Sequence, residues 1–252
     1  MRNDIPLFEY DSDPHAVIEP DHEKIDVRLP ERAVFAFVGE TVDAYAAERG
    51  WPAVAEFVTV TKCFRVYSGE ENGIPFALAE APLGAPAAAQ FLDWLMSYGV
   101  KIVVSAGSCG VLRDIPENAF LIPTRALRDE GTSYHYLPPS RFVETDDALR
   151  RSIGEIFAEK RIPLVECTTW TTDGFFRETA AKVRARREEG CTAVEMECAA
   201  LAAAAKFRGA RFAQILYTAD TLAHADNYDE RGWGEASRVP VLRLAIEAIT
   251  KT

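Results

Sequence analysis

The sequence predicts an α/β fold with a mostly parallel central sheet and helices on both faces of that sheet. Short apolar runs such as residues 33–38 have the composition of strands that are buried on both faces. Segments with helical spacing alternate with these runs, and no linker or break in composition interrupts the alternation. Repeated strand-then-helix units favour parallel pairing, because the crossover helix returns the chain to the start of the sheet.

Each expected element rests on a local pattern. Strands are expected where apolar runs are rich in β-branched and aromatic residues, and helices where apolar residues recur at helical spacing. In chain order the strands are expected at residues 33–38, 58–67, 75–79, 101–105, 119–122, 163–168, 191–194 and 211–217. The helices are expected at residues 85–98, 146–160, 177–189, 196–207 and 239–250. A glycine follows three of these helices, at Gly99, Gly190 and Gly209, where a left-handed residue commonly ends a helix.

The chain is long enough for one large core. It has 252 residues, of which 48% are hydrophobic and 27% are charged, as is typical of globular proteins. Residues 1–32 are rich in Asp and Pro and show no periodicity, so we expect them to form an arm that lies on the body or on a neighbouring subunit. Residues 33–252 are expected to form a single domain.

The charge balance argues against several classes of partner. Lys and Arg number 28 against 39 Asp and Glu, which gives a net charge of -11. An acidic surface repels phosphate backbones, so nucleic acids and anionic membranes are poor partners. No apolar segment approaches the ~20 residues of a membrane span, and no signal peptide is visible. The five cysteines form no CxxC pair, so we expect reduced thiols, no metal centre and a cytoplasmic location.

Three segments follow predicted strands, and ligands of open α/β sheets bind at the carboxyl ends of strands. These segments are Gly107-Ser-Cys-Gly110, Glu195-Met-Glu197 and Thr218-Ala-Asp220. The first is expected to be a turn whose backbone N–H groups, with the Ser108 hydroxyl, hold an anion or a polar oxygen. The alternative is a tight strand exit that needs glycine for its backbone angles.

Two carboxylates flank a methionine in Glu195-Met-Glu197. A buried carboxylate is costly unless it is hydrogen-bonded, and the paired hydroxyls of a sugar satisfy it well. A thioether packs softly against a sugar face. The alternative is that Glu195 or Glu197 caps the helix that follows. We expect at most one of the two side chains to face a ligand.

Asp220 ends an apolar strand, where it would serve either as a general acid or as a cap for the next turn. Phe175 or Phe176 would stack on a planar heterocycle or pack in the core. The lone histidines His135 and His224 are more typical of structural or surface positions than of metal ligands.

Together these segments resemble the nucleoside phosphorylase family, which includes purine nucleoside phosphorylases, uridine phosphorylases and related nucleosidases. The most specific element is Val194-Glu-Met-Glu197 before an Ala-rich helix, and the resemblance runs from about residue 33 to the C-terminus. It implies a three-layer α/β/α sandwich with a mostly parallel, partly mixed sheet. It also implies a homodimer or homohexamer that cleaves the N-glycosidic bond of a nucleoside.

The resemblance also implies roles for single residues around the sugar and the nucleophile. Glu197 would hold the ribose 2′- and 3′-hydroxyls, with Met196 against the sugar and Glu195 near the same hydroxyls. The nucleophile would be held by Gly39, Gly107 and Ser108.

On the base side, Phe175 would lie against the heterocycle and Asp220 would protonate purine N7. Glu197 and Asp220 are therefore expected to meet in one crevice. Uridine phosphorylases instead use a Gln and an Arg shortly after the aromatic residue, where this chain has Thr179 and Ala181. A purine is therefore favoured, although the segment at residues 128–136 looks like a loop of uridine phosphorylases and keeps uridine as the alternative.

The identity of the nucleophile stays open in the sequence. Phosphorolytic members surround phosphate with arginines, and this chain has Ser105 and Asp43 at two of those positions. The side chains of Arg65, Arg113 and Lys62, or a neighbour's arginine, are candidate replacements. We expect a phosphorylase that yields free base and ribose 1-phosphate, with phosphate as co-substrate and no cofactor. The alternatives are a hydrolase that uses water activated near Asp43 and a non-catalytic nucleoside-binding protein.

Overall fold

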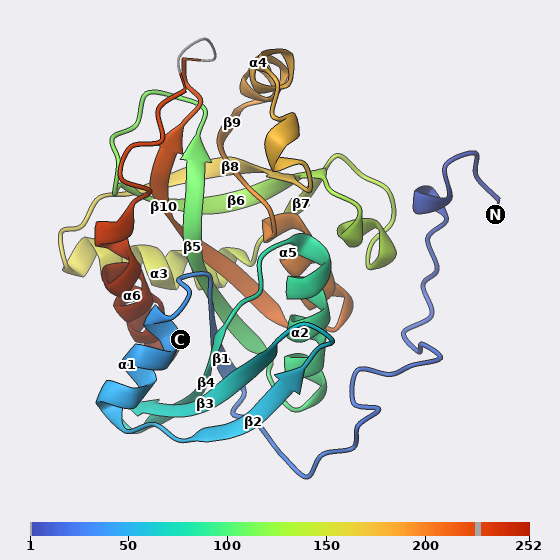
Figure 1. The fold of residues 1–252 in the computed structure, drawn as a ribbon, viewed down its shortest axis with the longest axis vertical. Helices are drawn as coiled ribbons and strands as arrows, with labels where there is room; N and C mark the ends of the chain where they lie inside the picture. Colours follow the sequence, from blue (N-terminus) through green and yellow to red (C-terminus); the bar gives the residue numbers. More distant parts are fainter. Residues whose placement is uncertain (1, 225–227) are drawn as a thin grey trace.

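The computed structural model describes residues 2–224 and 228–252. The strands in this part of the chain are β1 (Arg32–Ala36), β2 (Ala53–Val58), β3 (Cys63–Glu71), β4 (Ile74–Glu80), β5 (Ile102–Val111), β6 (Phe120–Asp129), β7 (Phe142–Glu144), β8 (Leu164–Thr172), β9 (Cys191–Glu195) and β10 (Arg211–Thr221). The helices are α1 (Thr41–Arg49), α2 (Ala85–Ser97), α3 (Asp147–Glu159), α4 (Ala180–Glu188), α5 (Cys198–Phe207) and α6 (Arg238–Lys251). Figure 1 shows their arrangement around one sheet.

The sheet has the order β10-β6-β8-β9-β5-β1-β4-β3-β2, with β7 beside β6. Because β10 also pairs with β5, the strands β10, β6, β8, β9 and β5 form a closed, barrel-like ring from which β1, β4, β3 and β2 extend. In the described residues, five strand pairs are parallel and five are antiparallel. The α/β class is confirmed. The prediction of a mostly parallel sheet in a simple three-layer sandwich is wrong, because the sheet is mixed and partly closed.

The length of β5 explains the closure. Its first half, Ile102 to Ala106, pairs with β1, and its last two residues, Gly110 and Val111, pair with β9. Because β5 extends beyond the end of β1, its last residues pair with β9 instead, and the twisted sheet closes on itself. The expected turn at Gly107-Ser-Cys-Gly110 is therefore wrong, because this segment continues β5 and pairs with β10.

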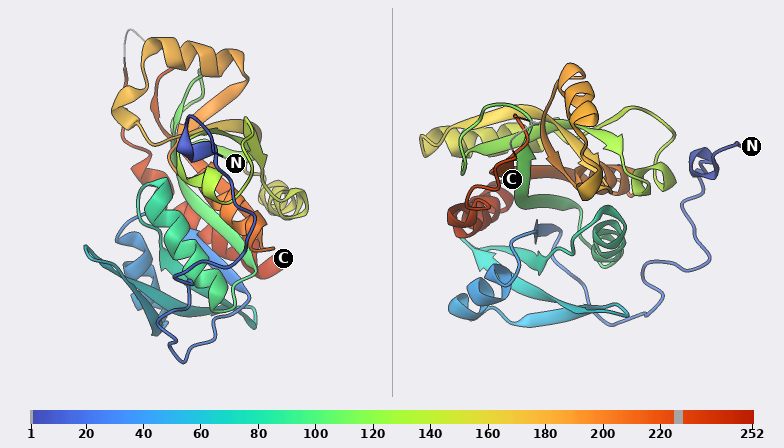
Figure 2. Two further views of the ribbon diagram at one scale, coloured as in Figure 1. Left: turned by 90° about the vertical axis from the view of Figure 1, so that its right-hand side faces the viewer. Right: turned by 45° about the horizontal axis from the view of Figure 1, so that its top comes forward.

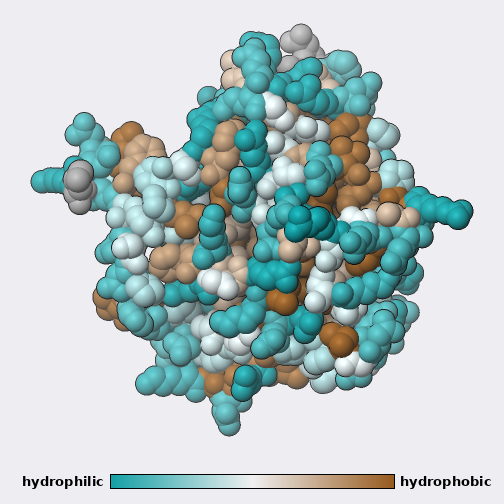
Figure 3. Space-filling view, turned by 180° about the vertical axis from the view of Figure 1, so that it is seen from behind, coloured by the Kyte–Doolittle hydropathy of each residue, from teal (hydrophilic) through white to brown (hydrophobic). Residues whose placement is uncertain are grey.

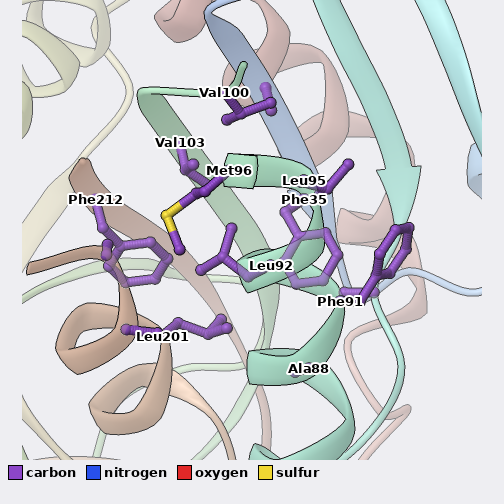
Figure 4. Close-up of a cluster of buried hydrophobic side chains, with 14 of the residues drawn as sticks. Phe35, Ala88, Phe91, Leu92, Leu95, Met96, Val100, Val103, Leu201 and Phe212 are labelled. Atoms are coloured by element: carbon purple, nitrogen blue, oxygen red, sulfur yellow. The ribbon is translucent and has the colours of Figure 1, made fainter. Parts of the chain in front are cut away.

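Helices cover both sides of the sheet (Figure 2). On one side α2 and α5 pack together, and Figure 4 shows Leu92 and Leu201 meeting between them, near Phe35 and Phe212 of the sheet. Six of the ten residues of α5 are alanine, and their small side chains let this helix lie close to its neighbours. On the other side, α1, α3 and α6 bury a second cluster against the sheet.

Several boundaries differ from the prediction for local reasons. The strand expected at residues 58–67 begins only at Cys63, because Thr59 closes a turn in which its N–H and hydroxyl both donate to the Lys62 carbonyl, at 2.9 and 2.8 Å. Helix α4 begins only at Ala180, since the Thr179 side chain accepts the Lys182 N–H and acts as the N-cap. Helix α1 and strands β2 and β7 have no counterpart in the prediction.

The residues before β1 cross the outside of the fold as an extended segment (Figure 1). Hydrogen bonds tie them to the α2–α5 side: Arg208 donates to the Pro14 carbonyl at 2.8 Å, the Trp94 indole donates to Glu23 at 3.3 Å, and the Leu29 N–H donates to the Tyr98 carbonyl at 2.8 Å. Among the described residues, no helix has the length and apolar character needed to cross a bilayer. The face in Figure 3 is mostly hydrophilic, with apolar side chains in separate patches.

Candidate active site

The end of β10, the 3-10 turn Phe175–Arg177 and the start of α4 enclose a pocket of about 460 Å³. The aromatic side chains of Phe175, Phe176, Tyr228 and Trp233 line it, together with the carboxyl groups of Asp220 and Glu178. Pockets of this size and composition bind small planar ligands. The structure thus brings Phe175 and Asp220 together, as expected of a base-binding pocket.

Asp220 lies in β10 and is 5% exposed. Burial raises the pKa of its carboxyl group, while a hydrogen bond from Tyr228 and the charge of Arg231 oppose the rise. Gly110 makes room for this carboxyl group, because a Cβ at residue 110 would lie 3.0 Å from Asp220 Oδ1 and 3.1 Å from Val194 Cγ1. A carboxyl group that keeps its proton more readily is suited to act as a general acid.

Glu178 is a second acid in this pocket, and sequence reasoning missed it. Burial and the charge of Asp220 raise the pKa of Glu178 to about 7, with Lys182 opposing them. Residue 178 lies within the charged helix expected at residues 177–189. In such a helix a glutamate is typical of the solvent-exposed face, so Glu178 was not considered as a site residue. The late start of α4 places it instead between the Phe175–Arg177 turn and the helix.

The raised pKa of Glu178 predicts a pH-dependent stability. Its ordinary pKa is 4.5, and the folded value is about 7. Because the folded state holds this proton more tightly than the unfolded state, the stability it contributes is complete below about pH 4.5 and is lost as the pH rises through 7. We expect the melting temperature of the wild type to fall over this range, and that of Glu178→Gln to fall less. Thermal scans at pH 5, 6, 7 and 8 test this, and parallel curves for the two proteins would contradict it.

Glu195 ends β9 with its carboxylate turned toward its own chain. It accepts the N–H groups of Glu197 and Cys198 at 2.8 and 2.6 Å, and the Thr171 hydroxyl at 2.6 Å. These bonds oppose the rise in pKa that burial causes. The alternative of a helix cap therefore holds for Glu195, because its oxygens bind the start of α5, and its expected place near the ribose hydroxyls stays a prediction.

Glu197 precedes α5, and its side chain is also buried, with 5% exposed. Its Oε1 accepts the Gly84 N–H at 2.5 Å, at the start of α2. Burial and the nearby charge of Glu195 raise the pKa of Glu197. Glu197 does not line the pocket of Asp220 in the described part of the chain, so this pocket by itself does not join the two side chains, and the single crevice stays a prediction. Between the two glutamates lies the half-buried Met196.

A cation not considered from the sequence lies near Ser108. Burial raises the pKa of Tyr217, and side-chain hydrogen bonds of its hydroxyl with Arg238 and Ser108 oppose this rise. Ser108 is exposed on β5, and Arg238 is the first residue of α6. The pairing of β10 with β5 places Tyr217 opposite Ser108, and Arg238 reaches Tyr217 from the start of α6, so no local pattern in the sequence announces Arg238. Gly107, one residue earlier, allows close approach of Phe37, since its Cβ would lie 3.0 Å from Phe37 Cβ.

Gly39 and Asp43 lie in the segment that follows β1. Gly39 has a φ of +57° between β1 and α1, and it lines a second pocket of about 640 Å³. Asp43 is on α1, where it accepts the Tyr67 hydroxyl at 2.9 Å and lies 3.7 Å from Arg65. Asp43 does not line either of these two pockets in the described residues.

Two of the cations suggested by the sequence are engaged elsewhere. Lys62 binds Glu80 at 2.8 Å, and Arg113 donates to the Arg187 carbonyl at 3.1 Å. Arg65, the third, faces Asp43. Lys62 nevertheless lines the pocket of Gly39, and Arg238, which lies 3.7 Å from Glu235, approaches Ser108 through Tyr217.

Residues 31–249 match the family model of the phosphorylase superfamily, and the chain belongs to this family. A guanosine phosphorylase of Halorubrum lacusprofundi is 25% identical over 205 residues, which cover 78% of this chain and 84% of that protein. The purine nucleoside phosphorylase of Toxoplasma gondii in complex with immucillin-H has a TM-score of 0.74 at 15% identity, over 88% of this chain and 91% of that one. An AMP nucleosidase of Bacteroides thetaiotaomicron has a TM-score of 0.71 at 22% identity, over 87% of each chain. Both structures share the fold.

Proposed function

We propose that the protein is a nucleoside phosphorylase that cleaves purine nucleosides into free base and ribose 1-phosphate. The observation that carries this proposal is the buried Asp220 facing an aromatic pocket with Phe175. As the glycosidic bond stretches, the leaving base gains negative charge and the ribose gains positive charge. Asp220 donates its proton at N7 of the base, a contribution of about 10²–10⁴-fold in rate.

Glu197 is the proposed ribose ligand, with Met196 against the sugar. In the described residues its carboxylate accepts the Gly84 N–H and is also bonded by the Met196 backbone, whereas a carboxylate has about four acceptor sites. A pair of vicinal hydroxyls would fill the remaining sites and compensate for burial. The carboxylate would also stabilise the positive charge that develops on the ribose. The proposal requires the space beside Gly84 to open, so that the ribose hydroxyls can reach the Glu197 carboxylate.

Phosphate is the proposed nucleophile, held beside Ser108 by Arg238, with Gly39 and Gly107 at the same edge. The arginine supplies the charge-assisted hydrogen bonds that a phosphate dianion needs on an acidic protein. We further propose that the protein acts as a homodimer or homohexamer.

Product analysis tests the reaction. The purified protein is incubated with inosine, guanosine and uridine, with and without phosphate. Phosphate-dependent release of hypoxanthine and guanine together with ribose 1-phosphate is expected. Free ribose formed without phosphate would contradict phosphorolysis and favour hydrolysis, the second candidate, which the presence of Ser105 and Asp43 in place of arginines supports. Binding of nucleosides without any turnover would favour the non-catalytic alternative.

Replacement of Arg238 by Gln is expected to raise KM for phosphate about 10–100-fold, because a hydrogen bond from a charged donor is lost. The KM for the nucleoside should change less. The matched control is Arg243→Gln, which removes the same charge from an exposed position of α6 near the Tyr45 ring. Initial rates over a range of phosphate concentrations measure both. Equal effects of the two substitutions would remove Arg238 from the phosphate site.

A further inference from the structure

We infer that Glu117 is a positioning residue, which holds residues 231–238 in place and through them shapes both the base pocket and the proposed phosphate site. We call residues 231–238 the connecting segment. The inference rests on the proposed function and extends it to a residue outside both sites. Glu117 is half-buried in the connection between β5 and β6, 115 residues before Gly232, which it binds.

The carboxylate of Glu117 accepts two backbone N–H groups of the connecting segment. Its Oε1 lies 3.0 Å from the Gly232 nitrogen and 2.8 Å from the Gly234 nitrogen. Trp233 is therefore held on both sides by one oxygen atom. Hydrogen bonds to an ionised carboxylate are stronger than those between neutral groups, so this contact is well suited to fix the backbone.

Two further hydrogen bonds join the same parts of the chain. Arg231 donates to the Ile115 carbonyl at 2.9 Å, and the Ser237 hydroxyl donates to the Asn118 side-chain oxygen at 2.9 Å. The connection between β5 and β6 is itself fixed to β10, because the Asn118 N–H donates to the Thr218 carbonyl at 2.9 Å. The connecting segment is thus tied to β10 through the residues around Glu117.

The backbone of the connecting segment is strained where Glu117 holds it. Trp233 has a φ of +55° and Arg231 a φ of +52°, in the left-handed region that residues with a side chain rarely adopt. Such a conformation persists only where surrounding contacts impose it. The bonds from Glu117 on either side of Trp233 are contacts of this kind, so the segment should relax when they are lost.

One part of the connecting segment belongs to the base pocket. Trp233 lines this pocket together with Asp220. Burial raises the pKa of Asp220, and the charge of Arg231 opposes this rise, so Arg231 also acts on the proposed general acid. Relaxation of the backbone at Trp233 would therefore change the wall of the pocket and the surroundings of the acid.

The next part of the segment reaches the proposed phosphate site. Gly234 is buried against Tyr217, since a Cβ at residue 234 would lie 2.7 Å from Cδ2 of that ring. The Tyr217 hydroxyl forms hydrogen bonds with Arg238 and Ser108, which are the proposed phosphate ligands. A shift of the segment would therefore displace Tyr217 and Arg238 as well.

Glu117 itself lines neither the base pocket nor the pocket of Gly39 in the described part of the chain. Its effect on the reaction must then pass through the connecting segment, which touches both sites. A residue with this role should influence the binding of nucleoside and phosphate together. A residue that served one site alone would influence only one of them.

Steady-state kinetics of Glu117→Ala test the inference. We expect KM for inosine and KM for phosphate each to rise about 10-fold or more, because small displacements of binding groups are costly. Glu117→Gln keeps an oxygen that can accept both N–H groups, so its KM values should stay within about threefold of the wild type. The matched control is Glu155→Ala, at an exposed position of α3, which should change neither constant.

The split between KM and kcat distinguishes this role from a purely structural one. A variant that is only less stable loses active enzyme, which lowers the apparent kcat and leaves both KM values unchanged. That result, or a change in KM for one substrate alone, would overturn the inference. So would equal effects of Glu117→Ala and Glu117→Gln.

Hydrogen exchange tests the contact without catalysis. The amides of residues 231–237 should exchange at least about 10-fold faster in Glu117→Ala than in the wild type, with exchange in α2 unchanged. In the wild type, hypoxanthine and phosphate added separately should each slow exchange in this segment, whatever the folding of the variant. No slowing by either ligand would overturn the inference.

These measurements separate the inference from the proposed function. If the wild type cleaves no nucleoside, the proposed function fails, and hydrogen exchange still decides whether Glu117 holds the connecting segment. If the wild type cleaves nucleosides and Glu117→Ala keeps both KM values, only the inference fails.

Discussion

Asp220→Asn is expected to lower kcat for release of a purine base by about 10²–10⁴-fold, which is the usual contribution of a general acid. The amide has the size of the carboxyl group and fits over Gly110, but it has no acidic proton to transfer to N7. Binding of the nucleoside should persist, so KM should change much less than kcat. Steady-state kinetics with inosine and saturating phosphate measure both constants.

The matched control is Asp114→Asn, which makes the same substitution at an exposed residue. Its kinetics and melting temperature should equal those of the wild type. A retained kcat in Asp220→Asn, with normal folding, would show that the leaving base does not depend on Asp220 for its proton.

The two glutamates that flank Met196 should respond in opposite ways to substitution. Glu195→Ala removes the acceptor of two backbone N–H groups and of the Thr171 hydroxyl, and Thr171 in turn accepts the Ala199 N–H. Leaving several buried donors without partners should lower the free energy of unfolding by about 3 kcal/mol or more. For a chain of this size that corresponds to a fall of about 6–12 °C in melting temperature.

Glu197→Gln should leave stability unchanged or raise it, because it removes one of two neighbouring negative charges and keeps an oxygen for the Gly84 N–H. The same substitution should lower kcat/KM for nucleosides about 10–100-fold, as expected when a charged partner of the ribose hydroxyls is lost. Such a gain in stability with a loss of activity is typical of a residue retained for function. Calorimetric scans and kinetics on both variants test the contrast. It fails if Glu197→Gln lowers the melting temperature or if Glu195→Ala leaves it unchanged.

Local patterns in the sequence were sufficient for the α/β class and the family, and they singled out Phe175 and Asp220, which the structure places in one pocket. These residues lie in short segments next to strongly apolar strands, where position along the chain fixes position at the sheet edge. The same reasoning assigned Glu195 and Glu197 alike, because only the path of the chain after β9 decides which carboxylate turns back to cap α5.

What the sequence did not reveal depends on contacts between distant segments. The closed ring arises because β5 is longer than β1 and also pairs with β9 and β10. No local pattern in the sequence encodes this change of pairing partner along β5. The same pairing places Tyr217 beside Ser108, and Arg238 meets Tyr217 from the distant helix α6. Glu178 was missed for a smaller reason, a three-residue error in the start of α4, which the Thr179 cap signals in retrospect.

Comparison of guanosine with 7-methylguanosine, in the wild type and in Asp220→Asn, tests the role of Asp220 most directly. The methylated base is already positively charged and leaves without receiving a proton at N7. Loss of the acid should therefore lower kcat for guanosine at least about 100-fold and that for 7-methylguanosine less than about threefold. Equal losses for the two substrates would show that Asp220 does not supply the proton to the departing base.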